Sequence, residues 1–188
     1  RFLTTSQSRF LTGTSSSGIC VQLAPMVERF QTLYVLGTGC ETTDLTGGSA
    51  TSCPRYVFRP YNATQSQAIA MAPWAIKNNI KSATSIYMDF SWGHSVAFDF
   101  RNEFVRLGGK WVEPVPCPLN ATDYIPYVTR ISKDVDAVVV AMSGGAAIKS
   151  MLAVADTGLS KKVKVLGPAS VCDVNTLEQH GKSVIGGN

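Results

Sequence analysis

A hydroxyl-rich loop near the amino end carries the first residues whose types and spacing could do chemistry. Residues 13–18 read Gly-Thr-Ser-Ser-Ser-Gly and are followed by apolar residues at helical spacing over residues 20–27. Serines at a helix start cap its free N–H groups, and those N–H groups, together with the helix dipole, also attract anions. The loop is therefore interpreted either as a helix cap or as an anion-binding site, in which Ser15, Ser16 and Ser17 are the candidate ligand contacts.

Catalytic motifs are sparse in this sequence. His94 follows Gly93 at the start of a helical pattern, where it is either a general base or a polar residue at a helix end. Pairing Ser15 with His94 in a hydrolase would need evidence that the sequence does not provide. The sequence has no nucleophile elbow, phosphate-binding P-loop or HExxH motif, and Gly37-x-Gly39 lacks the third glycine of a dinucleotide fingerprint. We therefore predict no catalytic residues, no cofactor and no enzymatic activity.

The cysteines form neither a CxxC pair nor a metal-ligand spacing with the two histidines. We therefore expect no metal site. The odd number leaves at least one thiol unpaired within the chain, and a disulfide between Cys40 and Cys53 is one pairing that the sequence allows. The five cysteines are Cys20, Cys40, Cys53, Cys117 and Cys172.

Composition and charge restrict the class of protein. Of 188 residues, 45% are hydrophobic and 16% are charged, which is typical of a globular chain. The net charge of +4 comes from scattered basic residues, the longest run being Lys161-Lys162, so we expect no nucleic-acid partner. Apolar runs such as residues 137–142 are too short to span a bilayer, and the amino end lacks the apolar core of a signal peptide. We therefore expect a soluble chain without direct membrane insertion.

Strand and helix patterns alternate along the chain. In the clearest unit, an apolar β-rich run from Thr84 ends at Asp89, and an amphipathic helical pattern follows over residues 96–107. Such repeats build an open, mostly parallel sheet with helices on both faces, so we predict an α/β fold. Further strands are predicted over residues 32–37, 56–60, 110–115, 136–142 and 163–166, and further helices over residues 65–78, 125–131, with Asp123 as N-cap, and 148–155. The predicted inward residues of the first and last of these helices are Ile69, Ala72, Ile76, Ile148, Met151, Leu152 and Ala155.

The loops that follow parallel strands gather at one edge of the sheet and form its ligand site. These loops contain hydroxyls and backbone N–H groups that suit a carboxylate, and Trp92 is either an aromatic wall of the site or a core residue. They comprise residues 15–17, 39–41, 89–92, 143–145 and 169–173.

Several stretches lie along the chain in a distinctive order and spacing: Gly13-TSSSG, Asp44-Leu-Thr46, Tyr56-VFRP, Ile86-YMDFSWG, Thr122-Asp-Tyr124, Asp136-AVVVAMSG, Gly158-Leu159 and Leu166-GP. Together they resemble the type I periplasmic substrate-binding proteins, in the branched-chain amino acid and amide branch. The resemblance implies two Rossmann-like lobes, joined by a hinge, that close on a ligand like a Venus flytrap and deliver it to an ABC transporter permease. It also implies that residues 1–60 are part of lobe one, without its N-terminal part, and that residues 61–188 are lobe two.

The same resemblance implies a set of ligand-binding positions. The carboxylate-binding serine falls on Ser15 or Ser16, and lobe-two contacts fall near Thr64, Trp92 and Ser143. Backbone contacts of the next loop fall on Gly39, Cys40 and Glu41. Where amino-acid binders have an acid for the ligand ammonium, this chain has Thr64 and either Ala169 or Ser170. An amide or an aromatic or aliphatic acid therefore replaces a leucine-like ligand, unless Glu41 or Asp173 supplies the charge.

The function implied is that of the solute-binding component of an ABC importer in the periplasm or outside the cell. Its partners would be the permease and a small amino acid, amide or organic acid. Two other classes remain open at this point: a small α/β hydrolase or transferase, and a ligand-sensing regulatory domain on the same fold.

Overall fold

The computed structural model describes residues 3, 5, 8–37, 39–45, 54–171, 174 and 177–181. The chain divides into two compact units, Arg1–Ser66 and Gln67–Asn188, here called unit 1 and unit 2. Each unit has its own sheet, and each is described by itself. The assignment of the units to two lobes stays a prediction.

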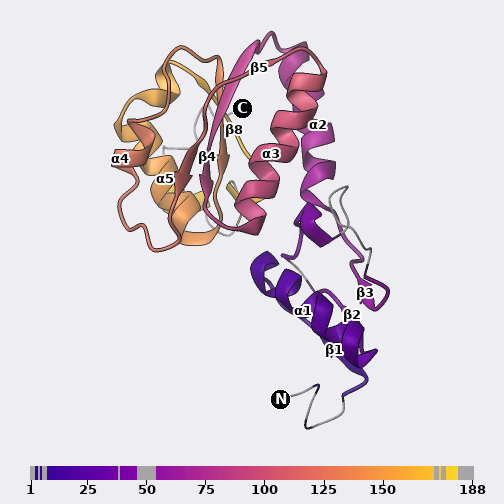
Figure 1. Cartoon of the computed structure of the whole chain (residues 1–188). Helices are drawn as coiled ribbons and strands as arrows, with labels where there is room; N and C mark the ends of the chain where they lie inside the picture. The colour runs from indigo at the N-terminus through magenta and orange to yellow at the C-terminus, as the bar shows by residue number, and fades with distance from the viewer. Residues whose placement is uncertain are drawn as a thin grey trace. The chain divides into compact units, whose positions relative to one another are not determined.

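Unit 1 is built on a parallel sheet with the strand order β1-β2-β3. Helix α1 connects β1 to β2 (Figure 1). Its buried residues pack with Tyr34 and Leu36 in one core. The opposite side chains of the sheet, Phe10 and Phe58, are 53% and 52% exposed. The elements are β1 (Phe10–Thr12), α1 (Ser17–Phe30), β2 (Leu33–Val35), the 3-10 turn η1 (Thr43–Leu45) and β3 (Val57–Phe58).

Unit 2 is a parallel sheet in which β4 and β7 are central, with the order β5-β4-β7-β8 and β6 also paired with β4. Helices α2 and α3 cover one face and α4 and α5 cover the other (Figure 1), each over its own core cluster. This arrangement confirms the predicted parallel α/β fold. The elements are α2 (Thr64–Lys77), β4 (Ser82–Met88), α3 (Ser91–Arg106), β5 (Lys110–Trp111), β6 (Val115–Cys117), α4 (Ile125–Val128), β7 (Ala137–Ala141), α5 (Gly144–Asp156), η2 (Leu159–Lys161), β8 (Lys164–Leu166), η3 (Ala169–Val171) and α6 (Leu177–His180).

The strand predicted over residues 110–115 is two short strands in the structure. Both β5 and β6 pair with β4, and residues 112–114 interrupt them. Pro114 has no N–H to donate to a ladder, which accounts for the interruption. Within it, the Thr84 hydroxyl of β4 donates to the Glu113 carbonyl at 2.9 Å, so this carbonyl has a hydrogen-bond partner where the pairing is broken.

The predicted inward faces of two helices are partly wrong. In α2, Ile69 is 56% exposed, whereas the small residues Ala68, Ala72 and Ala75 are buried. In α5, Leu152 is 39% exposed, and Ala147 and Val154 are among the buried residues. In both helices small side chains let the backbone approach its neighbours closely, so large apolar residues were a poor guide to the buried face.

The carboxylate of Asp136 ties the start of β7 to the start of β4. Its Oδ2 accepts hydrogen bonds from Lys81 N and Ser82 N, both at 2.8 Å, and from the Ser82 hydroxyl at 3.0 Å. Burial alone would raise the pKa of Asp136, but these hydrogen bonds outweigh it and lower the pKa below its usual value. The carboxylate is therefore ionised and acts as an acceptor at neutral pH.

We expect Asp136→Asn to destabilise the protein by about 1 kcal/mol at neutral pH, because the site is solvent-screened and one charged acceptor is lost. The folded-state pKa is lowered, so the wild-type advantage is present above the unfolded pKa of about 4 and is lost as the pH falls through the folded value. Chemical denaturation of wild type and variant between neutral and acidic pH measures this. Asp134→Asn, two residues away and exposed, is the control. A pH-independent difference between wild type and Asp136→Asn would contradict the assignment.

Candidate functional site

The serine loop, residues 13–17, leads directly into α1 in unit 1. Ser16 is the N-cap residue, but its side chain makes no capping hydrogen bond. The Ser17 hydroxyl also points elsewhere, donating to the Gly39 carbonyl at 3.1 Å. Of the two interpretations of the loop, capping by the side chain at the N-cap position is therefore not what the structure has. In the first turn, Ile19 N donates to the backbone carbonyl of Ser16 at 3.1 Å instead of to a serine side chain.

The glycine loop, residues 39–42, lies against the serine loop. Gly39 has φ +80°, and a Cβ on it would lie 2.9 Å from the Ser15 carbonyl carbon and closer still to the Ser15 oxygen. Only glycine permits this approach. Further along the loop, the Glu41 carbonyl accepts a hydrogen bond from Thr64 N at 2.9 Å. Unit 1 thus brings together the predicted positions Ser15, Ser16, Gly39, Cys40, Glu41 and Thr64.

A disulfide joins Cys40 in the glycine loop to Cys20 in α1, with a Cα–Cα distance of 6.2 Å. The Cys40–Cys53 pairing is therefore not the one that the structure has. Cys53 and Cys172 lie outside the described residues, as does Asp173. Cys117 at the end of β6 is a free thiol, and burial raises its pKa to about 12, which keeps it protonated and unreactive.

Two residues that the sequence analysis did not identify as functional, Arg59 and Tyr61, form hydrogen bonds to the backbone of the glycine loop. Arg59 Nη1 donates to the carbonyls of Cys40 at 3.1 Å and Thr42 at 2.8 Å. The Tyr61 hydroxyl accepts a hydrogen bond from Cys40 N at 2.9 Å. Burial lowers the pKa of Arg59, an effect that Tyr61 and Glu41 oppose, and burial raises the pKa of Tyr61. The one available signal was their position directly after β3, at the carboxyl edge of the sheet.

In unit 2 the predicted positions follow the carboxyl ends of β4, β7 and β8. Trp92 lies in the first turn of α3, is 6% exposed and belongs to the core cluster under α2 and α3. The Trp92 ring therefore packs mainly in the core, and its centroid lies 6.2 Å from that of the Phe90 ring. The Ser143 hydroxyl contacts Met88 Sδ at 3.6 Å, and Ala169 is exposed at the start of η3. Whether these residues bind ligand stays a prediction.

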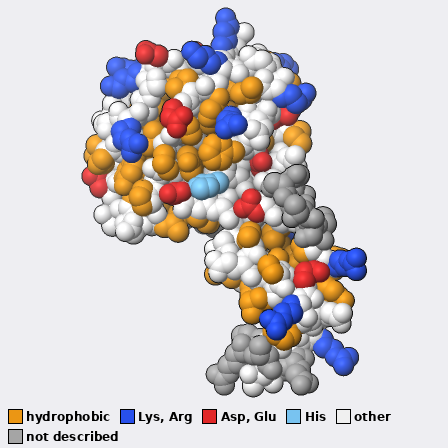
Figure 2. Space-filling model, in the orientation of Figure 1, with side chains coloured by type: hydrophobic (Ala, Val, Ile, Leu, Met, Phe, Trp, Pro, Cys, Tyr) orange, Lys and Arg blue, Asp and Glu red, His pale blue; other side chains and the backbone are white. Residues whose placement is uncertain are grey.

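His94 is paired with Asp89 in unit 2. Its Nε2 lies 2.7 Å from Asp89 Oδ1, and both side chains are about half exposed. The rings of Tyr87 and Phe98 meet the imidazole edge-on at 5.3 and 6.1 Å. These contacts are those of a polar residue at the start of α3. Figure 2 shows hydrophobic side chains exposed on one face of unit 2, with acidic and basic side chains among them.

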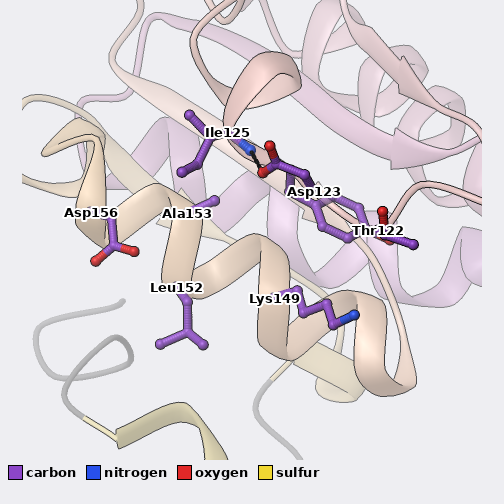
Figure 3. A pocket seen from close by; sticks show the side chains of 8 residues that line it. Thr122, Asp123, Ile125, Lys149, Leu152, Ala153 and Asp156 are labelled. Carbon is purple, nitrogen blue, oxygen red and sulfur yellow. Dashed lines mark hydrogen bonds between the residues drawn. The ribbon is translucent and has the colours of Figure 1, made fainter.

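A pocket of about 140 Å³ lies in unit 2 between α4 and α5 (Figure 3). Charged groups of both signs line it, with Asp123 and Asp156 on one hand and Lys149 on the other, over an apolar surface that includes Leu152. Asp123 Oδ1 accepts a hydrogen bond from Ile125 N at 3.0 Å, although the N-cap residue of α4 is Tyr124 rather than the predicted Asp123. None of the predicted ligand-binding residues lines this pocket.

The described part of the chain contains no group of three or more His, Cys, Asp or Glu residues arranged to hold a metal ion. Over the same residues, no helix has both the length and the apolar character needed to cross a membrane.

Comparisons with known proteins identify the fold. The sequence matches the family model described as periplasmic binding protein over residues 1–187. No curated protein matches it. A solute-binding protein of an ABC transporter from Rhodopseudomonas palustris BisB5, in complex with 3,4-dihydroxybenzoic acid, is 25% identical with a TM-score of 0.83, and the match covers 99% of this chain and 50% of that chain.

Two further solved structures have the same fold. A solute-binding protein of an ABC transporter from R. palustris, in complex with 4-hydroxybenzoate, is 21% identical with a TM-score of 0.84, over 97% of this chain and 49% of that chain. An ABC transporter substrate-binding protein from Sphaerobacter thermophilus is 20% identical with a TM-score of 0.83, over 97% of this chain and 50% of that chain. The chain therefore spans about half the length of these structures. The likeness confirms the predicted fold of the type I periplasmic binding proteins.

Proposed function

Because this chain belongs to the periplasmic binding protein family, we propose that it is the solute-binding component of an ABC importer and that its ligand is a small carboxylic acid. The observation that carries the proposal is the contact between the serine loop and the glycine loop in unit 1. The Ser16 side chain makes no capping hydrogen bond to α1, and Gly39 brings a second stretch of backbone against Ser15. A helix N-terminus with adjacent hydroxyl groups favours a carboxylate.

The charges near this loop favour an acid without an ammonium group. An ammonium removed from water needs a carboxylate partner. Thr64, in the same unit, is 1% exposed and uncharged. Glu41 is a carboxylate, but it lies near enough to Arg59 to act on the pKa of that guanidinium, so part of its charge is already balanced. An amino acid is therefore a weaker candidate than an aromatic or aliphatic acid or an amide.

Aromatic acids are the first ligands to test. The relative from R. palustris BisB5, which is 25% identical over nearly the whole chain, is in complex with 3,4-dihydroxybenzoic acid. A benzoate combines a planar apolar ring with one carboxylate, the group that the start of α1 favours. We take a hydroxybenzoate as the working ligand of this chain.

An oxidising compartment outside the cytoplasm fits the covalent structure of unit 1. Disulfides persist in the periplasm and outside the cell, whereas cytosolic thiols stay reduced. The Cys20–Cys40 bond is buried, with both residues 0% exposed, as expected of a structural disulfide. We therefore place the protein in the periplasm or outside the cell.

Binding rather than catalysis is the proposed activity. His94 has Asp89 as its partner. We expect no turnover of hydroxybenzoate esters or amides. Hydrolysis that Ser15→Ala or His94→Ala abolishes would replace the binding proposal by the hydrolase alternative.

A thermal melt against a ligand panel tests the proposal. The panel contains 3,4-dihydroxybenzoate, 4-hydroxybenzoate, leucine, valine and a short aliphatic amide, each at several concentrations. A ligand that binds only the folded state stabilises it by about 2.7 kcal/mol at a concentration 100 times its Kd, so the midpoint rises with concentration. We expect the rise with the benzoates. The melt is run in parallel on the 188-residue chain and on the product of the whole gene.

The two negative outcomes differ in meaning. A rise with leucine or valine alone would contradict the acid ligand and would assign the ammonium to Glu41 or Asp173. No rise with any panel ligand in either protein would contradict the ligand class proposed for this site.

A further inference from the structure

We propose that the Cys20–Cys40 disulfide is a positioning element of the ligand site, which holds the glycine loop against the serine loop before ligand arrives. This inference rests on the proposed function, because it assigns those two loops to ligand binding. It concerns unit 1 alone, in which every residue used below lies.

The bond lies one helical turn behind the predicted carboxylate contacts. Ile19 N and Cys20 N both donate to the Ser16 carbonyl at 3.1 Å, so the first hydrogen bonds of the helix tie Cys20 to the serine loop. Cys40 directly follows Gly39, the residue that contacts the Ser15 backbone. A covalent link between these two cysteines therefore fixes the spacing of the two loops where ligand contacts are expected.

Noncovalent contacts from α1 and from the segment after β3 also hold the glycine loop at Gly39 and Cys40. On the α1 side, the Ser17 hydroxyl donates to the Gly39 carbonyl at 3.1 Å. On the other side, Tyr61 accepts from Cys40 N and Arg59 donates to the Cys40 carbonyl. Both backbone polar groups of Cys40 are thus engaged, and its side chain is bonded to the helix. The residue is held at three points in a loop that belongs to no strand or helix.

Preorganisation gives this arrangement an effect on binding as well as on stability. When a loop becomes ordered only as ligand binds, the free-energy cost of ordering it weakens binding. In a loop that is already held in place, this cost is smaller. Removing the disulfide should therefore weaken ligand binding by about tenfold, which corresponds to about 1.4 kcal/mol.

A disulfide also stabilises the folded state by restricting the unfolded chain, so a fall in melting temperature alone would not distinguish the two roles. The distinguishing readouts are ligand affinity well below the melting temperature and hydrogen exchange of the glycine-loop amides. A disulfide with a purely stabilising role would move neither in a protein that remains folded.

The test compares three proteins by calorimetric titration with 3,4-dihydroxybenzoate: wild type, Cys20→Ala/Cys40→Ala, and Cys117→Ala. Cys117 is the matched control because it is a buried cysteine without a bond in unit 2. We expect the double variant to bind about tenfold more weakly, with faster exchange at residues 40–42, and the Cys117→Ala variant to bind like wild type. Peptide mapping without reductant should recover Cys20 linked to Cys40, and a Cys40–Cys53 link would overturn the inference.

The failures of this inference and of the proposed function can be told apart. Wild-type binding with unchanged affinity in the folded double variant overturns the inference and leaves the function standing. A wild-type protein that binds no panel ligand overturns both. If the double variant does not fold, exchange in the wild type decides. If the Cys40 amide is protected from hydrogen exchange without ligand, the loop is preformed and the inference is supported. If the amide is protected only when ligand is bound, the inference is overturned.

Discussion

Replacing Gly39 with alanine should reduce affinity for 3,4-dihydroxybenzoate about tenfold or more. The added methyl would lie 2.9 Å from the Ser15 carbonyl carbon, and a residue with φ +80° is itself strained when it is not glycine. The glycine loop must then move away from the serine loop, which separates the two groups of predicted ligand contacts. Calorimetric titration of the variant and the wild type measures the loss.

Gly37→Ala is the matched control for this prediction. It introduces the same methyl two residues earlier, where the nearest atom would be Gly13 Cα at an ordinary 3.6 Å. We expect its affinity to equal that of wild type. Ser17→Ala covers the case in which Gly39→Ala does not fold, because it removes only the hydrogen bond to the Gly39 carbonyl and should weaken binding severalfold. Unchanged affinity in both Gly39→Ala and Ser17→Ala would show that the contact between the loops has no role in binding.

The succession of strands and helices was predictable because each β-α unit buries a short apolar strand on both faces. Residues 137–141 form a continuous apolar run and become the fully buried β7. The glycine pair at 108–109 correctly indicated the end of α3. Parallel pairing then follows from the alternation, since right-handed crossovers place every strand end at the same edge.

What the sequence did not predict depends on contacts between distant residues. At the break between β5 and β6, the Glu113 carbonyl accepts a hydrogen bond from the hydroxyl of Thr84, a residue 29 positions away. The buried face of α2 is made of alanines, whose small size matters only once neighbouring elements lie close. Periodicity of large apolar residues contains neither kind of information.

The candidate site likewise has features that the sequence predicted and features that it did not. The position of its loops follows from topology, so the serine and glycine loops were both anticipated. Their mutual contacts were not, because the Cys20–Cys40 bond and the support from Arg59 and Tyr61 join segments about 20 residues apart. Cysteine counting cannot choose between pairings, and the structure selects a partner inside α1.

Replacing Gly93 with alanine should destabilise unit 2 by about 3 kcal/mol. Gly93 is buried in the first turn of α3, and a Cβ there would lie 2.9 Å from the Met88 carbonyl carbon and closer to its oxygen. That carbonyl already accepts a hydrogen bond from Phe90 N at 2.8 Å, so it belongs to the turn that connects β4 to α3. To relieve this clash, α3 would have to move away from the end of β4. Thermal denaturation should show a melting temperature lower by about 10 °C.

Gly145→Ala makes the same change in the first turn of α5, the corresponding helix after β7. No heavy atom would lie within 4 Å of the new methyl, and alanine is favoured over glycine in a helix by about 0.5–1 kcal/mol. We therefore expect Gly145→Ala to leave the melting temperature unchanged or raise it slightly. Opposite effects of one substitution at equivalent positions would show that close contact with β4, rather than helix propensity, requires glycine at residue 93. Equal melting temperatures for the two variants would contradict the close packing of α3 on the end of β4.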